Sequence, residues 1–230
     1  MKQKLLFNCL LTLIYLNCAT PSKLRVVKPE YEGESRFNAT ILVLPLNRDV
    51  VPYEQQLENE QNEKSKKTLL GRDRTFFYRY FGPAVSDVTT ADVIGIEPDF
   101  APDSIEFAQK TLPLDEKRQL EMYTPVSGCI NSEDFDPDFI LFLEDLFFDV
   151  MYKEEMRGVG TGSTEKYTMD TGIEYVLWDN KSEKIAAYGK INKSYNLMGL
   201  PTKNDYLKVL ELFARSIIEK SPLVIKQAIF

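Results

Sequence analysis

The sequence contains no histidine, one tryptophan and three cysteines among its 230 residues. Without histidine, the chain cannot form a serine or cysteine triad that relies on an imidazole base, and it lacks the commonest zinc ligand. Three cysteines are too few for the disulfide framework of a small secreted domain. The fold must therefore be held by a hydrophobic core, for which a chain of this length is sufficient.

Long apolar runs are also missing. The run at residues 5–16 is about a dozen residues long and includes Asn8 and Thr12, whereas a membrane-spanning helix needs about 20 apolar residues. Lys2 and Lys4 precede it, and the small or polar residues 19–22 follow it. This is the layout of a secretory signal rather than of a permanent membrane anchor.

The end of this signal, Tyr15-Leu16-Asn17-Cys18, resembles the lipobox of bacterial lipoproteins and departs from the usual pattern at Tyr15 and Asn17. The resemblance implies cleavage before Cys18 and diacylation of that cysteine, with residues 1–17 as the signal peptide. An uncleaved signal anchor and a secreted protein with a stray thiol remain alternatives. Cys129 would then be the one cysteine in the folded part, and we expect it to be partly buried and inert, because no histidine base is present.

Acidic residues outnumber basic ones, 35 to 28. The net charge is −7, and loss of Lys2 and Lys4 with the signal makes it about −9. A surface this acidic repels phosphate backbones and anionic headgroups. We therefore expect no nucleic-acid partner, and membrane attachment through the lipid on Cys18.

The rest of the chain divides into two parts. Residues 18–38 are expected to be the lipidated cysteine and a flexible tether, because the stretch from residue 22 is polar and lacks sustained periodicity. Residues 39–230 are expected to form a single domain. Residues 54–67 contain one large apolar residue, Leu57, and are predicted to be a solvated excursion.

Within the domain, strands are predicted at residues 39–47, 91–96 and 139–150, the last of them central in a sheet because both of its faces are apolar. The segments "GIEYVLWD" and "IAAYGKINKSY", joined by the turn "DNKSEK", predict two more strands of an antiparallel meander. Phe76, Phe77, Tyr80 and Phe81 predict a helix that ends at Gly82-Pro83, with an aromatic face that packs in the core. Short helices are expected at residues 103–110 and 115–122.

A final helix is predicted to start at Thr202 and Asp205, with a stripe of Tyr206, Leu210, Phe213 and Ile217. The mixture of elements predicts an α+β fold: a mixed, largely antiparallel sheet with a carboxy-terminal β-meander packed against helices.

The order of these elements, with "TILVLP", "DPDFILFLEDL" and the hairpin "EYVLWDNKSEKIAAYGKI" before the last helix, resembles a group of bacterial envelope lipoproteins. Their anticodon-binding-like α/β sandwich is seen in penicillin-binding-protein activator lipoproteins, in the curli secretion lipoprotein and in the amino-terminal domain of the Tol translocation protein. The pattern carries no catalytic motif. The resemblance implies a cell-envelope protein that binds other envelope proteins. We expect this protein to be lipid-anchored in the outer membrane and to use no cofactor.

Three patterns suggest chemistry, and each has a simpler explanation. Asp134, Asp136 and Asp138 have the spacing of a calcium loop, but Phe139 replaces the required glycine. The glycines of "GVGTGST" lack the lysine of a phosphate-binding loop. Strand alternation places Asp145 and Asp149 on one side of their strand about 13 Å apart, and Glu144 on the other. No pair among these fits glycoside hydrolysis alone.

Two functions therefore remain. The favoured one is a non-enzymatic envelope lipoprotein that docks a partner protein, and the alternative is a carboxylate-dependent hydrolase of an envelope polymer. The candidate partner-binding residues form the glycine-rich connection between two strands: Arg157, Gly158, Val159, Gly160, Thr161, Gly162, Ser163 and Thr164. Loops held by a rigid scaffold often carry binding residues. If this connection does not bind a partner, the aromatic face at residues 76–81 is the next candidate.

Overall fold

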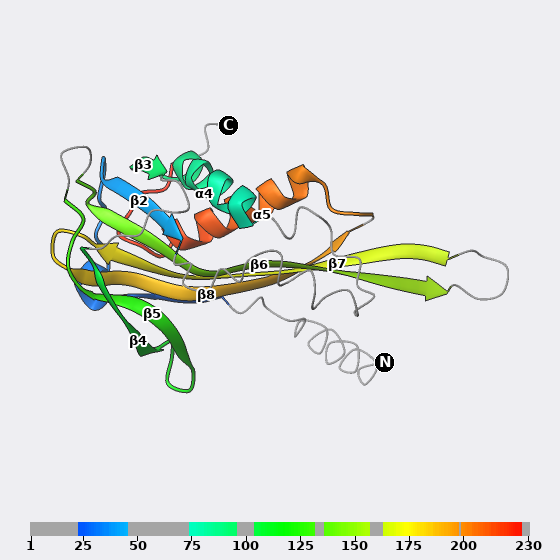
Figure 1. The fold of residues 1–230 in the computed structure, drawn as a ribbon, viewed down its shortest axis with the longest axis horizontal. Coiled ribbons are helices and arrows are strands. Elements are labelled where there is room, and N and C mark those ends of the chain that lie inside the picture. The colour runs from blue at the N-terminus through cyan, green and yellow to red at the C-terminus, as the bar shows by residue number, and fades with distance from the viewer. Residues whose placement is uncertain are drawn as a thin grey trace, which may run out of the picture.

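The computed structural model describes residues 23–45, 74–95, 104–131, 136–156, 163–197 and 199–226. These residues form a six-stranded sheet, with helices α4 and α5 on one face and the hairpin of β4 and β5 on the other (Figure 1). The elements are β1 (Lys23–Val27), η1 (Pro29–Tyr31), β2 (Thr40–Pro45), α4 (Arg74–Val88), β3 (Asp92–Gly95), β4 (Glu106–Pro113), β5 (Gln119–Ser127), β6 (Phe139–Met156), β7 (Ser163–Asp179), β8 (Lys184–Leu197) and α5 (Lys203–Ile218).

The strand order is β1-β8-β7-β6-β2-β3. Strand β2 is parallel to β3 and β6, whereas β6, β7, β8 and β1 are antiparallel to their neighbours. This arrangement confirms the α+β fold and the carboxy-terminal meander. The predicted central strand is β6, which lies between β7 and β2.

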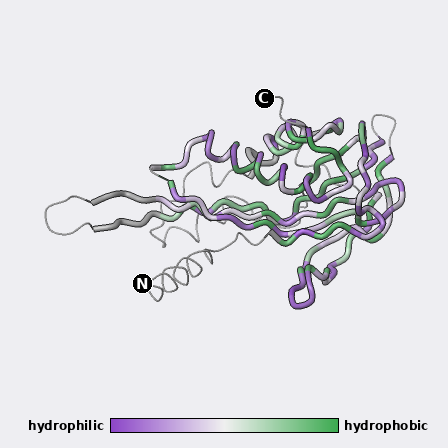
Figure 2. The backbone as a smooth tube through the Cα atoms, turned by 180° about the vertical axis from the view of Figure 1, so that it is seen from behind, coloured by the Kyte–Doolittle hydropathy of each residue, from purple (hydrophilic) through white to green (hydrophobic). Residues whose placement is uncertain are grey.

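Strands β2 and β6, which are neighbours in the sheet, are apolar on both faces because both faces are covered. Toward the helices point Ile41, Val43, Phe139, Leu141 and Leu143; toward the hairpin point Leu42, Leu44, Ile140 and Phe142. All of these side chains are buried. A sheet with layers on both faces needs such unbroken apolar strands, and Figure 2 shows the hydrophobic stretches along the middle of the sheet.

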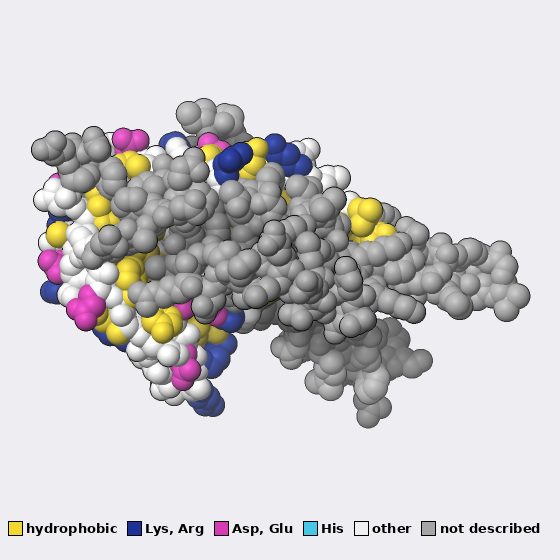
Figure 3. Space-filling model, in the orientation of Figure 1, with side chains coloured by type: hydrophobic (Ala, Val, Ile, Leu, Met, Phe, Trp, Pro, Cys, Tyr) yellow, Lys and Arg dark blue, Asp and Glu magenta, His cyan; other side chains and the backbone are white. Residues whose placement is uncertain are grey.

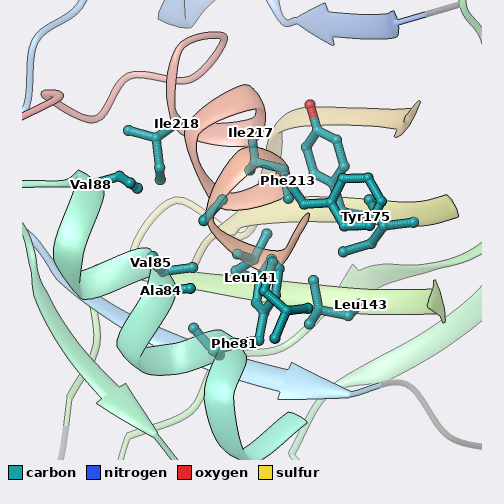
Figure 4. Close-up of a cluster of buried hydrophobic side chains, with 14 of the residues drawn as sticks. Phe81, Ala84, Val85, Val88, Leu141, Leu143, Tyr175, Phe213, Ile217 and Ile218 are labelled. Atoms are coloured by element: carbon teal, nitrogen blue, oxygen red, sulfur yellow. The ribbon is translucent and has the colours of Figure 1, made fainter. Parts of the chain in front are cut away.

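The two helices pack on one another and on the sheet. Helix α5 starts with the predicted capping box of Thr202 and Asp205, and its predicted stripe of Tyr206, Leu210, Phe213 and Ile217 is buried. Figure 4 shows Phe81 and Val85 of α4 close to side chains of α5 and of β6. The aromatic-stripe prediction is confirmed for Phe81, which is fully buried; the side chains of Phe76 and Phe77 lie outside the described residues.

The predicted end of the first helix was wrong. Helix α4 continues through Pro83 to Val88. Proline removes one hydrogen bond from a helix interior, but Pro83 is exposed, while Ala84, Val85 and Val88 beyond it are buried. Burial of this additional turn against α5 and the sheet offsets the lost hydrogen bond.

The two short helices predicted around Pro113 were also wrong. Strands β4 and β5 form an antiparallel hairpin in which Leu112 pairs with Leu120. In β5, Leu120, Met122 and Thr124 are buried and alternate with exposed residues, which is the period of a half-buried strand. Figure 3 shows charged side chains at the hairpin tip, where the turn residues are Asp115, Glu116, Lys117 and Arg118.

Polar bonds fix this hairpin to the sheet. The Tyr188 hydroxyl donates to the carbonyl of Pro113, and the Trp178 indole donates to the carbonyl of Gly128 at 3.3 Å. The Tyr123 amide donates to the Glu144 carboxylate at 2.9 Å. The hairpin is therefore a fixed third layer that covers one part of the sheet face opposite the helices.

The predicted tether at residues 18–38 was wrong from residue 23 onward. Strand β1 pairs with β8, with Arg25 opposite Gly189. Tyr31 is buried, and its hydroxyl donates to Asp179 at 2.9 Å; burial and this bond raise the pKa of Tyr31 to about 12. An edge strand of five residues with basic side chains has too short a pattern to stand out from a polar linker. The fold thus starts at Lys23, not at Ala39.

Three buried hydroxyls have no hydrogen-bond partner among the described residues, those of Thr124, Tyr175 and Tyr195. Tyr175 is fully buried beneath the helices, and burial raises its pKa. A buried, unpaired hydroxyl costs about 1–3 kcal/mol. We predict that Tyr175→Phe increases the free energy of unfolding by about 1 kcal/mol in urea titration.

The matched control is Tyr188→Phe. It removes the hydroxyl that donates to the carbonyl of Pro113, so it should lower the free energy of unfolding by about 1 kcal/mol. Equal destabilisation by the two variants would contradict the assignment of Tyr175 as unpaired.

Candidate interaction surface

Strands β6 and β7 form a ribbon that extends beyond the rest of the sheet (Figure 1). They pair from Phe139 opposite Asp179 to Met156 opposite Ser163. Strand β8 follows β7 only as far as Tyr167 opposite Leu197, and β2 pairs with β6 only over residues 139–143. The ribbon is thus anchored in the core at one end.

A β-bulge in β6 sets which side chains leave the core. Leu143 is opposite Tyr175 and Leu146 is opposite Ile173, so one extra residue lies between them on β6. Odd-numbered residues face the helices before the bulge, and even-numbered ones, such as Phe148, face them after it. The bulge breaks the alternation on which the predicted placement of Asp145 and Asp149 relied.

Beyond the bulge, one face of the ribbon is covered by helix α5. The ring of Phe148 lies 5.4 Å from that of Tyr206 and 6.5 Å from that of Phe213, measured between centroids. The opposite face carries the alternate residues. We call these the ribbon-root face; its members are Phe147, Asp149 and Met151 of β6, Thr168, Asp170 and Gly172 of β7, and Asn192 and Ser194 of β8.

Two large apolar side chains are exposed on the ribbon-root face. Phe147 is 37% exposed and Met151 is 38% exposed. The Phe147 ring lies across the backbone of Gly172, because a Cβ atom there would be 2.2 Å from the ring. Gly172 thus leaves room for the ring close to the sheet, because any larger residue there would collide with it.

Two carboxylates lie between these apolar side chains. Asp149 and Asp170 are directly opposite on neighbouring strands, which places their Cβ atoms about 5 Å apart. Both are half-buried, and within the described part of the chain neither has a hydrogen bond or an ion pair. Like charges in this arrangement destabilise a sheet. By contrast, the nearby Glu174 forms an ion pair with Lys190.

A third acceptor adjoins the two carboxylates. The side-chain oxygen of Asn192 is buried and receives no hydrogen bond from the described residues. It lies next to Phe147 over Gly172, since a Cβ atom at Gly172 would be 2.6 Å from it. The ribbon-root face therefore combines exposed apolar side chains with unpaired acceptors.

The predicted partner-binding residues fall mostly elsewhere. Arg157 and residues 158–162 lie outside the described residues. Ser163 and Thr164, expected in the loop, belong to β7, where they pair with Met156 and Glu155. The pairing of Asp149 with Asp170 was not predicted. Tyr80 belongs to the aromatic face at residues 76–81, the second candidate for partner binding, and its hydroxyl accepts a hydrogen bond from Lys203 Nζ at 3.0 Å.

The predicted calcium-loop residues have structural partners. Asp138 accepts a hydrogen bond from the Thr40 amide at 2.9 Å, and Asp136 forms an ion pair with Lys181; Asp134 lies outside the described residues. Across the described ranges, no group of three histidine, cysteine or acidic side chains is placed to hold a metal ion. Cys129 is a free thiol that is half-buried, and this partial burial was predicted.

Among the described helices, none is both long and apolar enough to cross a bilayer. No family model matches the sequence, and no curated protein matches it. Among solved structures, the chain is similar to one described as a neuraminyllactose-binding hemagglutinin homolog from Helicobacter pylori, with 9% identity over 81% of this chain and 84% of that one. The TM-score is 0.28, which is too low to indicate a shared fold or function.

Proposed function

We propose that this chain is a lipid-anchored protein of the bacterial cell envelope, in the outer membrane, that docks another envelope protein and has no catalytic activity. The observation that supports docking most directly is the ribbon-root face. It lies on three paired strands of the sheet and exposes Phe147 and Met151 beside two unpaired carboxylates. Exposed apolar side chains grouped with polar ones are typical of interaction sites.

The lipid anchor is supported by the amino-terminal sequence. The positive start, the short apolar run and Cys18 follow the order of a lipoprotein signal. The resemblance to envelope lipoproteins with the anticodon-binding-like sandwich is likewise a prediction from the sequence.

The first test of this proposal is Cys18→Ser. We expect the variant to lose incorporation of a radiolabelled fatty acid, and to accumulate as a precursor about 2 kDa heavier than the mature chain, because the signal of 17 residues is not removed. Cys129→Ser is the control, since it alters a half-buried thiol away from the signal. Unchanged acyl labelling of Cys18→Ser would contradict the lipoprotein proposal.

One observation favours the alternative, a hydrolase of an envelope polymer. Asp149 and Asp170 stand opposite each other on neighbouring strands, and retaining glycosidases use two carboxyl groups about 5 Å apart. Against this, both side chains lie half-buried on an open sheet face. If the pair were catalytic, Asp149→Asn alone would abolish hydrolysis of peptidoglycan or envelope polysaccharide by the purified protein, whereas a docking protein would show no such hydrolysis in either form.

A further inference from the structure

We propose that the ribbon-root face binds a protein segment that places an arginine side chain between Asp149 and Asp170, with apolar side chains of that segment against Phe147 and Met151. This inference rests on the proposed docking function and specifies the chemistry of the partner. The occupant follows from three features of the face: its charge, its unpaired acceptors and its position relative to the anchor.

The negative charge of the ribbon-root face favours binding of a cation. Asp149 and Asp170 repel each other across the strand pair, and no described basic side chain pairs with either. A cationic side chain bound between them would remove this repulsion and donate hydrogen bonds to both carboxylates. A metal ion fits poorly, because no third histidine, cysteine or acidic side chain among the described residues is grouped with the pair; their register neighbours along β6 are Phe147 and Met151.

The acceptors and the ring favour arginine over lysine. A guanidinium group is planar and has five N–H donors, so it can bond two carboxylates at once. The exposed ring of Phe147 can stack on a guanidinium plane. Lysine, a compact cation, would use fewer of these groups.

The same charges exclude two other occupants. Anionic lipid headgroups and nucleic-acid backbones would be repelled by the two carboxylates. Phe147 and Met151 flank the acidic pair along β6, at positions i and i+4 on the same face of the strand. An extended segment with apolar residues on both sides of an arginine matches this alternation.

The anchor places the face near the membrane. Strand β1 begins at Lys23, which pairs with Ile191 of β8. Ile191 pairs in turn with Ile173 of β7, and Ile173 follows Gly172 of the ribbon-root face. Five Cα steps separate Cys18 from Lys23, which is at most about 18 Å. A lipid on Cys18 would therefore hold the ribbon root close to the bilayer surface, so the partner should itself lie at the membrane.

The test is photo-crosslinking of the full acylated chain in membranes, with p-benzoylphenylalanine in place of Met151 and mass spectrometry of the attached peptide. We expect the attached peptide to contain an arginine with apolar residues on both sides. Adding Asp149→Asn and Asp170→Asn to this chain should lower the yield of that adduct at least tenfold, because loss of a charge partner typically weakens binding by more than this.

The matched control is Glu121→Gln, which removes an exposed carboxylate from β5 in the hairpin layer and should leave the yield unchanged. The Asn double variant should also be at least as stable as the parent chain, because like-charge repulsion is removed. An adduct to lipid, an attached peptide without arginine, or an unchanged yield in the double variant would each overturn the proposal. A failed Cys18→Ser test would instead overturn the lipoprotein assignment, which fatty-acid labelling reports separately.

Discussion

Asn180→Ala should lower the free energy of unfolding by about 3–5 kcal/mol, one of the two largest effects expected for a single substitution in this chain. Asn180 is 2% exposed, at the turn between β7 and β8. Its side-chain oxygen accepts from the Ile130 amide at 2.8 Å, and its amide nitrogen donates to the carbonyls of Ile130 and Pro137 at 2.8 and 2.9 Å.

The size of this effect follows from the backbone groups that alanine would leave behind. Three buried backbone groups lose their partner at once, and each such group costs about 1–3 kcal/mol. These groups belong to the chain that follows the hairpin and to the chain that enters β6. The substitution should therefore loosen the contact between the hairpin layer and the sheet as well as the turn.

Urea titration followed by tryptophan fluorescence would measure the effect, because Trp178 is the single tryptophan and is buried two residues before Asn180. Lys181→Ala is the control: Lys181 is exposed and its ion pair with Asp136 joins two exposed side chains, so it should change stability by less than about 1 kcal/mol. A loss below about 1 kcal/mol for Asn180→Ala would show that water replaces the amide.

The sequence predicted those elements whose patterns are long. The unbroken apolar run of β6 and the capped, amphipathic α5 were predicted because burial on both strand faces, or along one helix stripe, leaves a clear period. The hairpin of β4 and β5 was predicted as helices, because Leu112 is the one buried residue of β4, which leaves that strand without a visible period of two. Strand β1 was missed because it has five residues, two of them basic, within a polar stretch.

The candidate site could not be predicted because it depends on register. With the loop expected at residues 157–164, Met156 would have been opposite Glu165 and Asp149 opposite Gly172. In the structure Met156 is opposite Ser163, so Asp149 is opposite Asp170. A difference of two residues in the length of one connection keeps each side chain on its face but changes its partner. The register therefore decides whether two carboxylates meet.

Gly189→Ala should displace strand β1 and lower the free energy of unfolding by about 3 kcal/mol. A Cβ atom at residue 189 would lie 2.4 Å from the carbonyl oxygen of Leu24 and 3.0 Å from the Cα of Arg25. Both atoms belong to the backbone of β1, so no side-chain rotation can relieve the contact. Overpacking of this kind typically costs 1–3 kcal/mol, to which the lost bond between Arg25 and the Ser216 carbonyl adds.

Hydrogen exchange of the backbone amides in residues 24–28 would locate the change, because displacement of β1 exposes them while the amides of β6 and β7 stay protected. Gly199→Ala is the matched control: no atom lies within 4 Å of its added Cβ, so stability should stay equal or rise slightly. Unchanged protection of residues 24–28 in Gly189→Ala would contradict a tightly paired β1.

Displacement of β1 would also test whether partner binding depends on the distance between the lipid anchor and the ribbon-root face, because β6 and β7 would remain folded. With β1 paired, five Cα steps connect Cys18 to Lys23, so the edge of the sheet at Lys23 stays within about 18 Å of that anchor. Once β1 and Lys28, whose amide donates to the Ala186 carbonyl, are released, the next contact is Tyr31, so the reach grows to about 45 Å. If the partner lies at the bilayer surface, Gly189→Ala should lower the yield of the crosslink from residue 151 even at temperatures where β6 and β7 remain folded. A full yield under those conditions would place the partner away from the membrane and leave the arginine proposal standing on the charge of the face alone.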